Sequence, residues 1–168
     1  MLTKPYRPKI NFPSSTTGKI ANIIGCMAIL FSLIFIAWNW SSLPAQVPMH
    51  FNGIGEIDRW GSKYEMLLLP VINIALFIGL QIVENKPHLH NYPDRINEAN
   101  VEQFYKVSKR IINYTKNVCA ILFAYITYEI VIMAQQERLL LNSTAFIVLI
   151  ASLFIIIFAG IIKMARVQ

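Results

Sequence analysis

Four long apolar stretches constrain this chain more than any other feature of its sequence. They lie at 20–38, 66–83, 118–134 and 145–162, and each is 17 to 19 residues long. A helix rises about 1.5 Å per residue, so each stretch covers most of the roughly 30 Å hydrocarbon core of a bilayer. Glu129 is the single charged residue within all four. The pattern predicts an all-α chain that forms a four-helix transmembrane bundle.

The rest of the composition agrees with a membrane protein. Only 14% of the residues are charged, whereas soluble domains typically carry about 25%. We divide the chain into a polar tail, 1–19, which we expect to be cytoplasmic and mobile, and a membrane domain, 20–168. The first apolar stretch is long for a signal peptide and lacks a small-x-small cleavage pattern, so we interpret it as an uncleaved span. Cys26 and Cys119 lie within spans and are expected to pack as small apolar side chains.

The positive charges predict the orientation of the bundle. Of 15 Lys and Arg residues, 12 fall on one side of the four spans, and only Arg59, Lys63 and Arg138 fall on the other. Positive charge concentrates on the cytoplasmic side of membrane proteins. We therefore expect both termini and the loop 84–117 in the cytoplasm, and the loops 39–65 and 135–144 outside. The net charge of +6 is therefore explained by the topology. The sequence has no basic patch interleaved with aromatic residues, which is the pattern that would suggest nucleic-acid binding.

The first outer loop, 39–65, carries the most particular sequence. "VPMHFNGIGEIDRWGSK", from Val47 to Lys63, contains three glycines, which allow backbone angles that a Cβ forbids. Asn52–Gly53 is a turn dipeptide. Trp60, together with Trp38 and Trp40 just before, suits the boundary between lipid and headgroup. These features predict a structured extracytoplasmic loop.

The loop also resembles a known family. Leu43–Pro44, Pro48, His50–Phe51, Gly55, Asp58 and Lys63 follow the spacing of a bacterial integral-membrane family defined by a domain of unknown function shared with the sporulation-delaying-toxin immunity protein. A weaker likeness continues through "NEANVEQFYKVSKRIINYTK", so the resemblance covers roughly 25–135. It implies four or more membrane helices, a bacterial cytoplasmic membrane and no established enzymatic activity. Sharing one domain does not transfer immunity itself.

The cytoplasmic loop has two predicted halves. Residues 84–96 contain two prolines and are expected to be irregular, with His88 and His90 facing solvent. Residues 98–112 have the apolar spacing of an amphipathic helix. Glu98, Glu102, Lys106 and Arg110 follow each other at intervals of four on another face. We expect this helix to lie on the cytoplasmic surface and to run into the third span.

One set of residues is predicted to bind a ligand or partner. We expect the outer loop to fold over the mouth of the bundle, with His50 and Asp58 facing inward toward Glu129. The set is His50, Asn52, Gly55, Asp58, Trp60, Lys63 and Glu129. A metal held by His50, Asp58 and Glu129 is an alternative, although the spacing matches no established zinc signature. A third reading is structural: His50 braces the loop, and Asp58 pairs with Arg59 or Lys63.

Three functions remain open from the sequence. The first is a non-enzymatic membrane protein, immunity- or envelope-sensing-like, whose outer loop recognises a peptide, lipid or protein partner. The second is a small proton-coupled transporter that uses Glu129. The third is a membrane metalloenzyme built on His50, Asp58 and Glu129. No phosphate-cradling or nucleophile motif occurs and no cofactor is expected, while the lipid bilayer is an expected partner and the length is compatible with a homo-oligomer.

Overall fold

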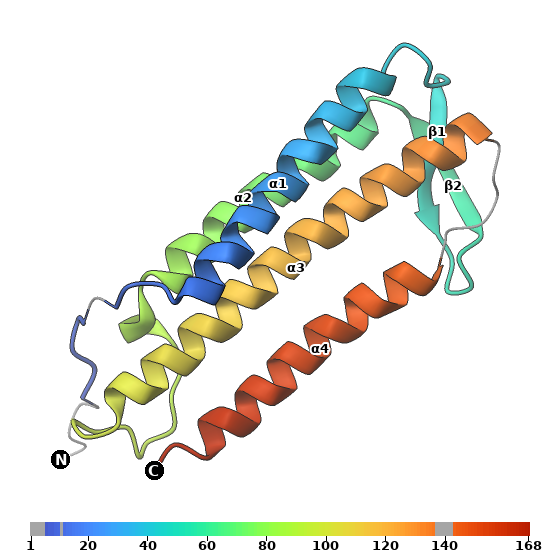
Figure 1. The fold of residues 1–168 in the computed structure, drawn as a ribbon. Helices are drawn as coiled ribbons and strands as arrows, with labels where there is room; N and C mark the ends of the chain where they lie inside the picture. The colour runs from blue at the N-terminus through green and yellow to red at the C-terminus, as the bar shows by residue number, and fades with distance from the viewer. Residues whose placement is uncertain (1–5, 11, 137–142) are drawn as a thin grey trace.

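The computed structural model describes residues 6–10, 12–136 and 143–168. Within them, four helices are long and apolar enough to cross a membrane: α1 (Thr16–Asn39), α2 (Leu68–Glu84), α3 (Val101–Gln136) and α4 (Ser143–Ala165) (Figure 1). A short 3-10 turn, η1 (Glu65–Leu67), leads into α2. Each predicted apolar stretch falls on one of these helices, the second stretch on η1 and α2 together, so the prediction of four helices of membrane-spanning length is confirmed.

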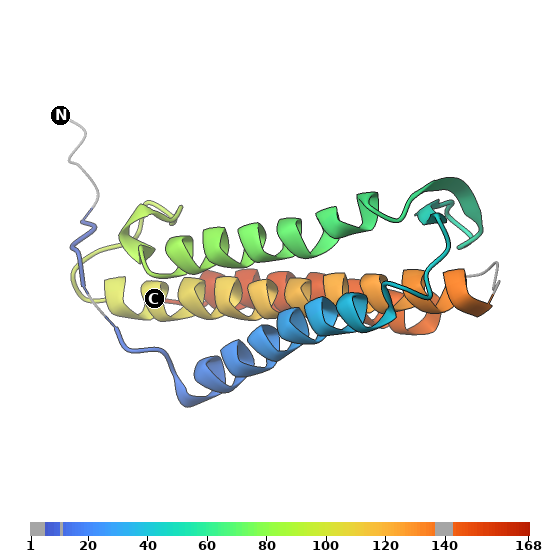
Figure 2. The same ribbon diagram turned by 90° about the horizontal axis from the view of Figure 1, so that it is seen from above.

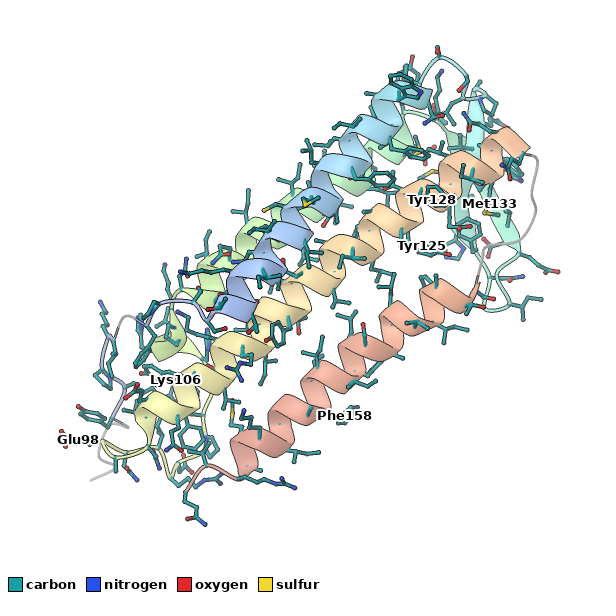
Figure 3. The ribbon with its side chains drawn as sticks, viewed as in Figure 1. Glu98, Lys106, Tyr125, Tyr128, Met133 and Phe158 are labelled. Atoms are coloured by element: carbon teal, nitrogen blue, oxygen red, sulfur yellow. The ribbon has the colours of Figure 1, made fainter. Side chains whose placement is uncertain are left out.

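The central helix of the bundle is α3. It passes between α1 and α2, and α4 lies along another side of it (Figure 2). In the apolar 18-residue segment of α3, 50% of the residues are buried inside the protein. The corresponding share is 17% for the α1 and α2 segments and 6% for the α4 segment. Most of the surface of α4 therefore faces outward, where exposed side chains such as Phe158 project from it (Figure 3). In a bilayer this surface would contact acyl chains.

Small residues bring α1 and α4 close to α3. The buried residues of α1 include Gly18, Gly25 and Ser32, which recur every seven residues along one face. A Cβ added at Gly25 would lie 2.1 Å from Oδ1 of Asn117, so only glycine fits there. Gly160 plays the same part on α4, since a Cβ there would lie 2.3 Å from the Ile111 side chain. Small residues are the usual means by which membrane helices approach closely.

The predicted amphipathic helix proves to be the first turns of α3. The chain contains neither Pro nor Gly between residues 101 and 136, so nothing interrupts the helix before it enters the third span. Phe104 and Tyr105 are fully buried, while Glu102 and Lys106 are exposed. The apolar face packs inside the protein, in a cluster that we call the lower cluster: Tyr92, Ile96, Val101, Phe104, Tyr105 and Val167. The apolar face of this helix segment therefore packs against protein.

The described part of the N-terminal tail packs against the same end of α3. Lys109 Nζ donates to the Phe12 carbonyl oxygen at 2.7 Å, and the Tyr105 hydroxyl donates to the Pro8 carbonyl oxygen at 3.1 Å. The expectation of a mobile tail is therefore wrong for this segment. Ser15 caps α1, because its Oγ accepts from the Gly18 N–H at 3.1 Å. Lys4 lies outside the described residues.

The first outer loop contains a β-hairpin, so the all-α expectation needs correction. β1 (Gln46–Phe51) pairs antiparallel with β2 (Ile57–Ser62), and the register shifts near His50. Proline is tolerated at position 48 because a two-stranded sheet has only edge strands. The hairpin lies at one end of the bundle, and the start of α1 and the C-terminus lie at the other (Figure 1). Residues 137–142 of the second outer loop, including Arg138, lie outside the described part of the chain.

Candidate functional site

One side of the hairpin is anchored on the bundle. Val47 is fully buried, and it forms an apolar cluster with Ile36 of α1 and with Ile130 and Val131 of α3. Met49 and Phe51, which follow at alternate positions of β1, pack partly buried against this cluster. Side chains two residues apart point to the same side of a strand. This side of β1 therefore lies on the bundle.

Lys63 holds the base of the hairpin. Its Nζ donates to the carbonyl oxygens of Trp40 at 3.1 Å and Leu43 at 3.4 Å, and it lies 4.9 Å from the centre of the Trp40 ring. These contacts join the end of β2 to the chain that leaves α1. Lys63 was predicted to bind a partner, but its position makes it a structural residue.

Asn52 and Gly55 shape the turn between the strands. Oδ1 of Asn52 accepts from the N–H groups of Ile54 at 3.1 Å and Glu56 at 2.9 Å, and its Nδ2 donates to Oε2 of Glu56 at 2.9 Å. Gly55 has a φ of 86°, in the left-handed region where side chains are disfavoured. Both residues therefore fix the conformation of the turn and leave Ile54 exposed at its tip.

His50 and Asp58 form a pair on the exposed side of the hairpin. Nδ1 of His50 lies 2.5 Å from Oδ1 of Asp58, and the side chains are 65% and 42% exposed. The expectation that both face inward toward Glu129 is wrong, because Met49 and Phe51 occupy the inward positions of β1 and leave His50 pointing outward. Asp58 therefore pairs neither with Arg59 nor with Lys63. Arg59 instead pairs with Glu65 at 3.0 Å, and Trp60 is 46% exposed nearby.

Glu129 lies apart from this pair, buried on α3. Its residue is only 2% exposed. Ile111 of α3 packs on Gly160 of α4. Glu129 lies 18 residues after Ile111, which is about five helical turns and returns to the same face of the helix. Glu129 thus lies on the face of α3 toward α4. Tyr128, the residue before Glu129, packs against Phe35 of α1 with ring centres 5.4 Å apart, and Figure 3 labels both Tyr125 and Tyr128 near the hairpin end of α3.

The proposed metal ligands are not brought together. Among the described residues, no group of three His, Cys, Asp or Glu side chains is placed to hold a metal ion. His50 and Asp58 supply two such groups, but Glu129 is buried on another element. The described geometry gives the metalloenzyme hypothesis no support.

A buried polar network at the end of the bundle opposite the hairpin was not predicted from the sequence. Lys116 Nζ lies 2.7 Å from Oε2 of Glu84 and 2.5 Å from Oε1 of Gln81. Asn113 Nδ2 donates to Glu84 and to Oδ1 of Asn22, which joins α1, α2 and α3. Glu84 and Lys116 stand just outside two apolar stretches and were counted as loop charges. The sequence did contain a signal for their burial. No Pro or Gly separates either residue from its apolar stretch, so each can belong to the same helix as that stretch.

Gln81 and Asn73 of α2 make the helix contacts that their polarity in a span suggests. Asn73 is 1% exposed, and its Nδ2 donates to the Ala120 carbonyl oxygen at 3.2 Å. Gln81 accepts from Lys116 in the network just described. Both contacts join α2 to α3, as polar side chains within membrane helices commonly do.

His90 is held inside the loop between α2 and α3. Its Nε2 lies 2.8 Å from the Val83 carbonyl oxygen and its Nδ1 lies 3.0 Å from Ser108 Oγ, so a neutral ring can donate at Nε2 and accept at Nδ1. Tyr92 also contacts Ser108, at 2.7 Å. Burial lowers the pKa of His90 and raises the pKa of Tyr92 to about 12. The prediction that His90 faces solvent is therefore wrong.

One comparison with known protein families matches the part of the chain that contains the hairpin. Residues 27–74 match a family described as a domain of unknown function, DUF1648. An uncharacterized protein of Archaeoglobus fulgidus is 40% identical over 87 residues, which cover 51% of this chain and 48% of that protein. The chain thus spans about half the length of this curated relative. No solved structure matches. The family match covers part of α1, the whole hairpin and the start of α2, and the specific link to the toxin-immunity protein stays a prediction.

Proposed function

We propose that this chain is a non-enzymatic membrane protein whose hairpin binds a polypeptide partner outside the membrane. The supporting observation is the exposed pair of His50 and Asp58 on a hairpin whose opposite side is buried on α3. A scaffold that is fixed on one side and exposed on the other can present binding groups without a large loss of conformational freedom on binding.

The chemistry of the exposed side favours a polypeptide. His50, Asp58 and Arg59 offer hydrogen-bond donors and acceptors of both charges, and Trp60 and Ile54 add exposed apolar area. Aromatic and Arg side chains are enriched where proteins bind proteins. A two-stranded sheet also offers strand edges to which an extended peptide can add. The arrangement supports recognition by a mixture of side-chain and main-chain contacts.

The orientation is part of the proposal. Lys and Arg residues are concentrated at the end of the bundle that holds the start of α1 and the C-terminus, and the hairpin lies at the opposite end. The positive-inside bias supports an orientation with the hairpin outside the cytoplasmic membrane. A partner would therefore be a secreted peptide or an extracytoplasmic part of another membrane protein.

Photo-crosslinking in host cells tests this function. A photoreactive amino acid at Ile54, which is 74% exposed, is expected to give a discrete polypeptide adduct. The adduct should weaken strongly when Asp58→Ala is added, because that change removes the His50 partner. A matched probe at Glu98, at the other end of the bundle, should not give this adduct. An adduct at Ile54 that is insensitive to both Asp58→Ala and His50→Ala, or no adduct at all, would contradict the proposal.

A further inference from the structure

A cavity lined by several charged residues lies at the end of the bundle opposite the hairpin. It has a volume of about 370 Å³ and lies between the start of α1, the segment before it and the first turns of α3. Three cationic side chains of α3 line it: Lys106, Lys109 and Arg110. The cavity lies where α1 begins and α2 ends, which is the level at which a lipid headgroup meets a membrane protein.

Two of the three cations have no carboxylate partner among the described residues. Lys106 pairs with Glu102, and Glu84 on the cavity wall is occupied by Lys116. For Lys109 and Arg110, the described residues provide no carboxylate within ion-pair distance, and Lys109 donates only to the Phe12 carbonyl oxygen. The start of α1, capped by Ser15, adds the positive end of a helix dipole to the same wall. The uncompensated charge of the cavity is therefore positive.

The lining of the cavity includes a buried hydrogen-bond acceptor, the side-chain oxygen of Asn113. Asn113 lines the cavity and is 2% exposed. Its Nδ2 is bonded to Glu84 and Asn22, but its Oδ1, close to Gly18, has no hydrogen-bond partner among the described residues. A buried carbonyl oxygen without a donor is unfavourable. A ligand that brings a hydroxyl group to this oxygen would satisfy it.

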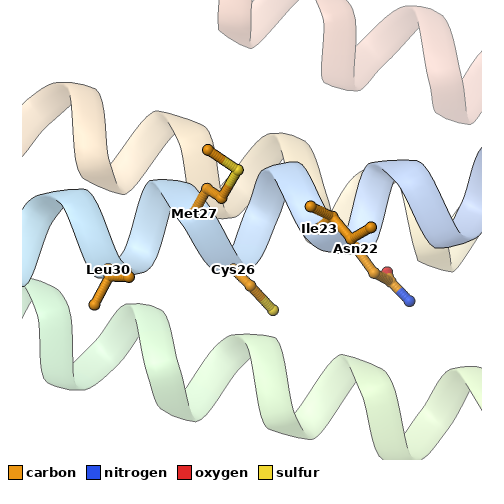
Figure 4. Close-up of a pocket in the computed structure, with 5 residues that line it drawn as sticks. All are labelled: Asn22, Ile23, Cys26, Met27 and Leu30. Atoms are coloured by element: carbon orange, nitrogen blue, oxygen red, sulfur yellow. The ribbon is translucent and has the colours of Figure 1, made fainter.

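An apolar depression continues along the same helix. It begins at Asn22, one turn after Gly18, and has a volume of about 330 Å³. Its lining comes entirely from α1: Asn22, Ile23, Cys26, Met27 and Leu30 (Figure 4). A positively charged cavity followed along one helix by an apolar depression matches the order of headgroup and acyl chain in a phospholipid. Free phosphate would use only the first of the two.

We propose that this cavity binds the headgroup of an anionic phospholipid, with its phosphodiester on Lys109 and Arg110, a hydroxyl of a glycerol-like headgroup on Asn113, and an acyl chain along α1. Basic pockets beside membrane helices on the cytoplasmic side are suited to such lipids. Because both cations come from α3 while the acyl depression belongs to α1, the bound lipid would bridge these two helices.

Native mass spectrometry of the full chain, released from bilayer discs, tests the proposal. Discs of phosphatidylglycerol and phosphatidylcholine in equal amounts are expected to yield protein that retains phosphatidylglycerol preferentially. Arg110→Gln should weaken this retention about fivefold, as expected for removing one charge near a membrane surface, and adding Lys109→Gln should weaken it further. Lys163→Gln removes an exposed charge from α4 at the same end and should leave retention unchanged.

Two results would overturn the proposal. One is equal retention of phosphatidylglycerol by the wild type, Arg110→Gln and Lys163→Gln, because the charge at the cavity would then have no effect. The other is equal protection from thermal unfolding by glycerophosphate and by phosphatidylglycerol, because the site would then bind a free phosphate and the acyl depression would be irrelevant. Arg110 is exposed, so Arg110→Gln is expected to fold and remains informative if the double variant does not.

Discussion

The ammonium group of Lys116 lies 2.7 Å from the carboxylate of Glu84, and both side chains are shielded from solvent between α2 and α3. The Phe77 ring, 4.9 Å from Nζ, lies beside the ammonium group. Gln81 and Asn113 supply further hydrogen bonds, so both charges are partnered. The network joins three helices at the end of the bundle opposite the hairpin.

Breaking this pair on one side should destabilise the protein strongly. Glu84→Gln leaves the Lys116 ammonium buried without an anion, and Lys116→Met leaves the carboxylate alone. Each is expected to lower the free energy of unfolding by about 3–5 kcal/mol. Denaturant unfolding of purified protein in detergent, followed by circular dichroism, measures the loss.

The double variant provides the control for this prediction. Glu84→Gln with Lys116→Met removes both charges, so its loss should be clearly smaller than the sum of the two single losses. Additive losses would show that the two side chains do not stabilise each other.

Two glycines form a matched pair for testing the packing of α1. Gly25→Ala should destabilise the protein by about 1–3 kcal/mol, because the new methyl group would overlap Oδ1 of Asn117. Gly79→Ala in α2 meets nothing within 4 Å, and should be neutral or stabilise by up to about 1 kcal/mol. Thermal unfolding of both variants in the same detergent gives the comparison. A tolerated Gly25→Ala would contradict the close contact of α1 and α3.

Because of His90, the protein is expected to lose stability in mild acid. Burial lowers the pKa of His90 below the ordinary value of 6.5, with further lowering from His88 and Lys109. Between the two pKa values the unfolded chain binds more protons than the folded chain, so stability rises with pH in this window. The stabilising contribution of neutral His90 is complete above about pH 6.5, and it is lost as the pH falls through the pKa of His90 in the folded protein.

The pH prediction is checked by the midpoint of thermal unfolding between pH 7.5 and 5. His90→Gln cannot titrate and should flatten the acid decline, whereas His88→Gln should keep most of it. An acid decline that is the same in the wild type and His90→Gln would assign the effect to other groups.

The hairpin variants should separate binding from folding. The His50–Asp58 pair is exposed, and such pairs contribute less than about 1 kcal/mol, so Asp58→Ala should leave the amount of protein in the membrane nearly unchanged. Gly55→Val should reduce it, because valine is disfavoured at a φ of 86°. Quantitative immunoblotting of membrane fractions measures both. Equal loss in the two variants would show that the pair is needed for folding.

The sequence predicted the helices well because membrane spans depend on a simple sum of apolar residues. It misplaced His50 because Pro48 and three nearby glycines suggested a constrained loop without strands, so the alternation of a strand was not applied. It missed Glu84 and Lys116 because each apolar stretch was ended at the first charge, although Glu84 is the last residue of α2 and Lys116 lies well inside α3. Pairing of these charges depends on how α2 packs against α3, which no local pattern specifies.

Impermeant maleimide labelling of single cysteines in intact cells tests the central claim, that the hairpin faces outside the membrane. In a chain with Cys26 and Cys119 replaced by Ala, Ile54→Cys should be labelled without permeabilisation. Glu98→Cys, exposed at the other end of the bundle, should be labelled only after the membrane is opened. Labelling of Glu98→Cys in intact cells, with Ile54→Cys protected until permeabilisation, would contradict both the topology and the proposed recognition site.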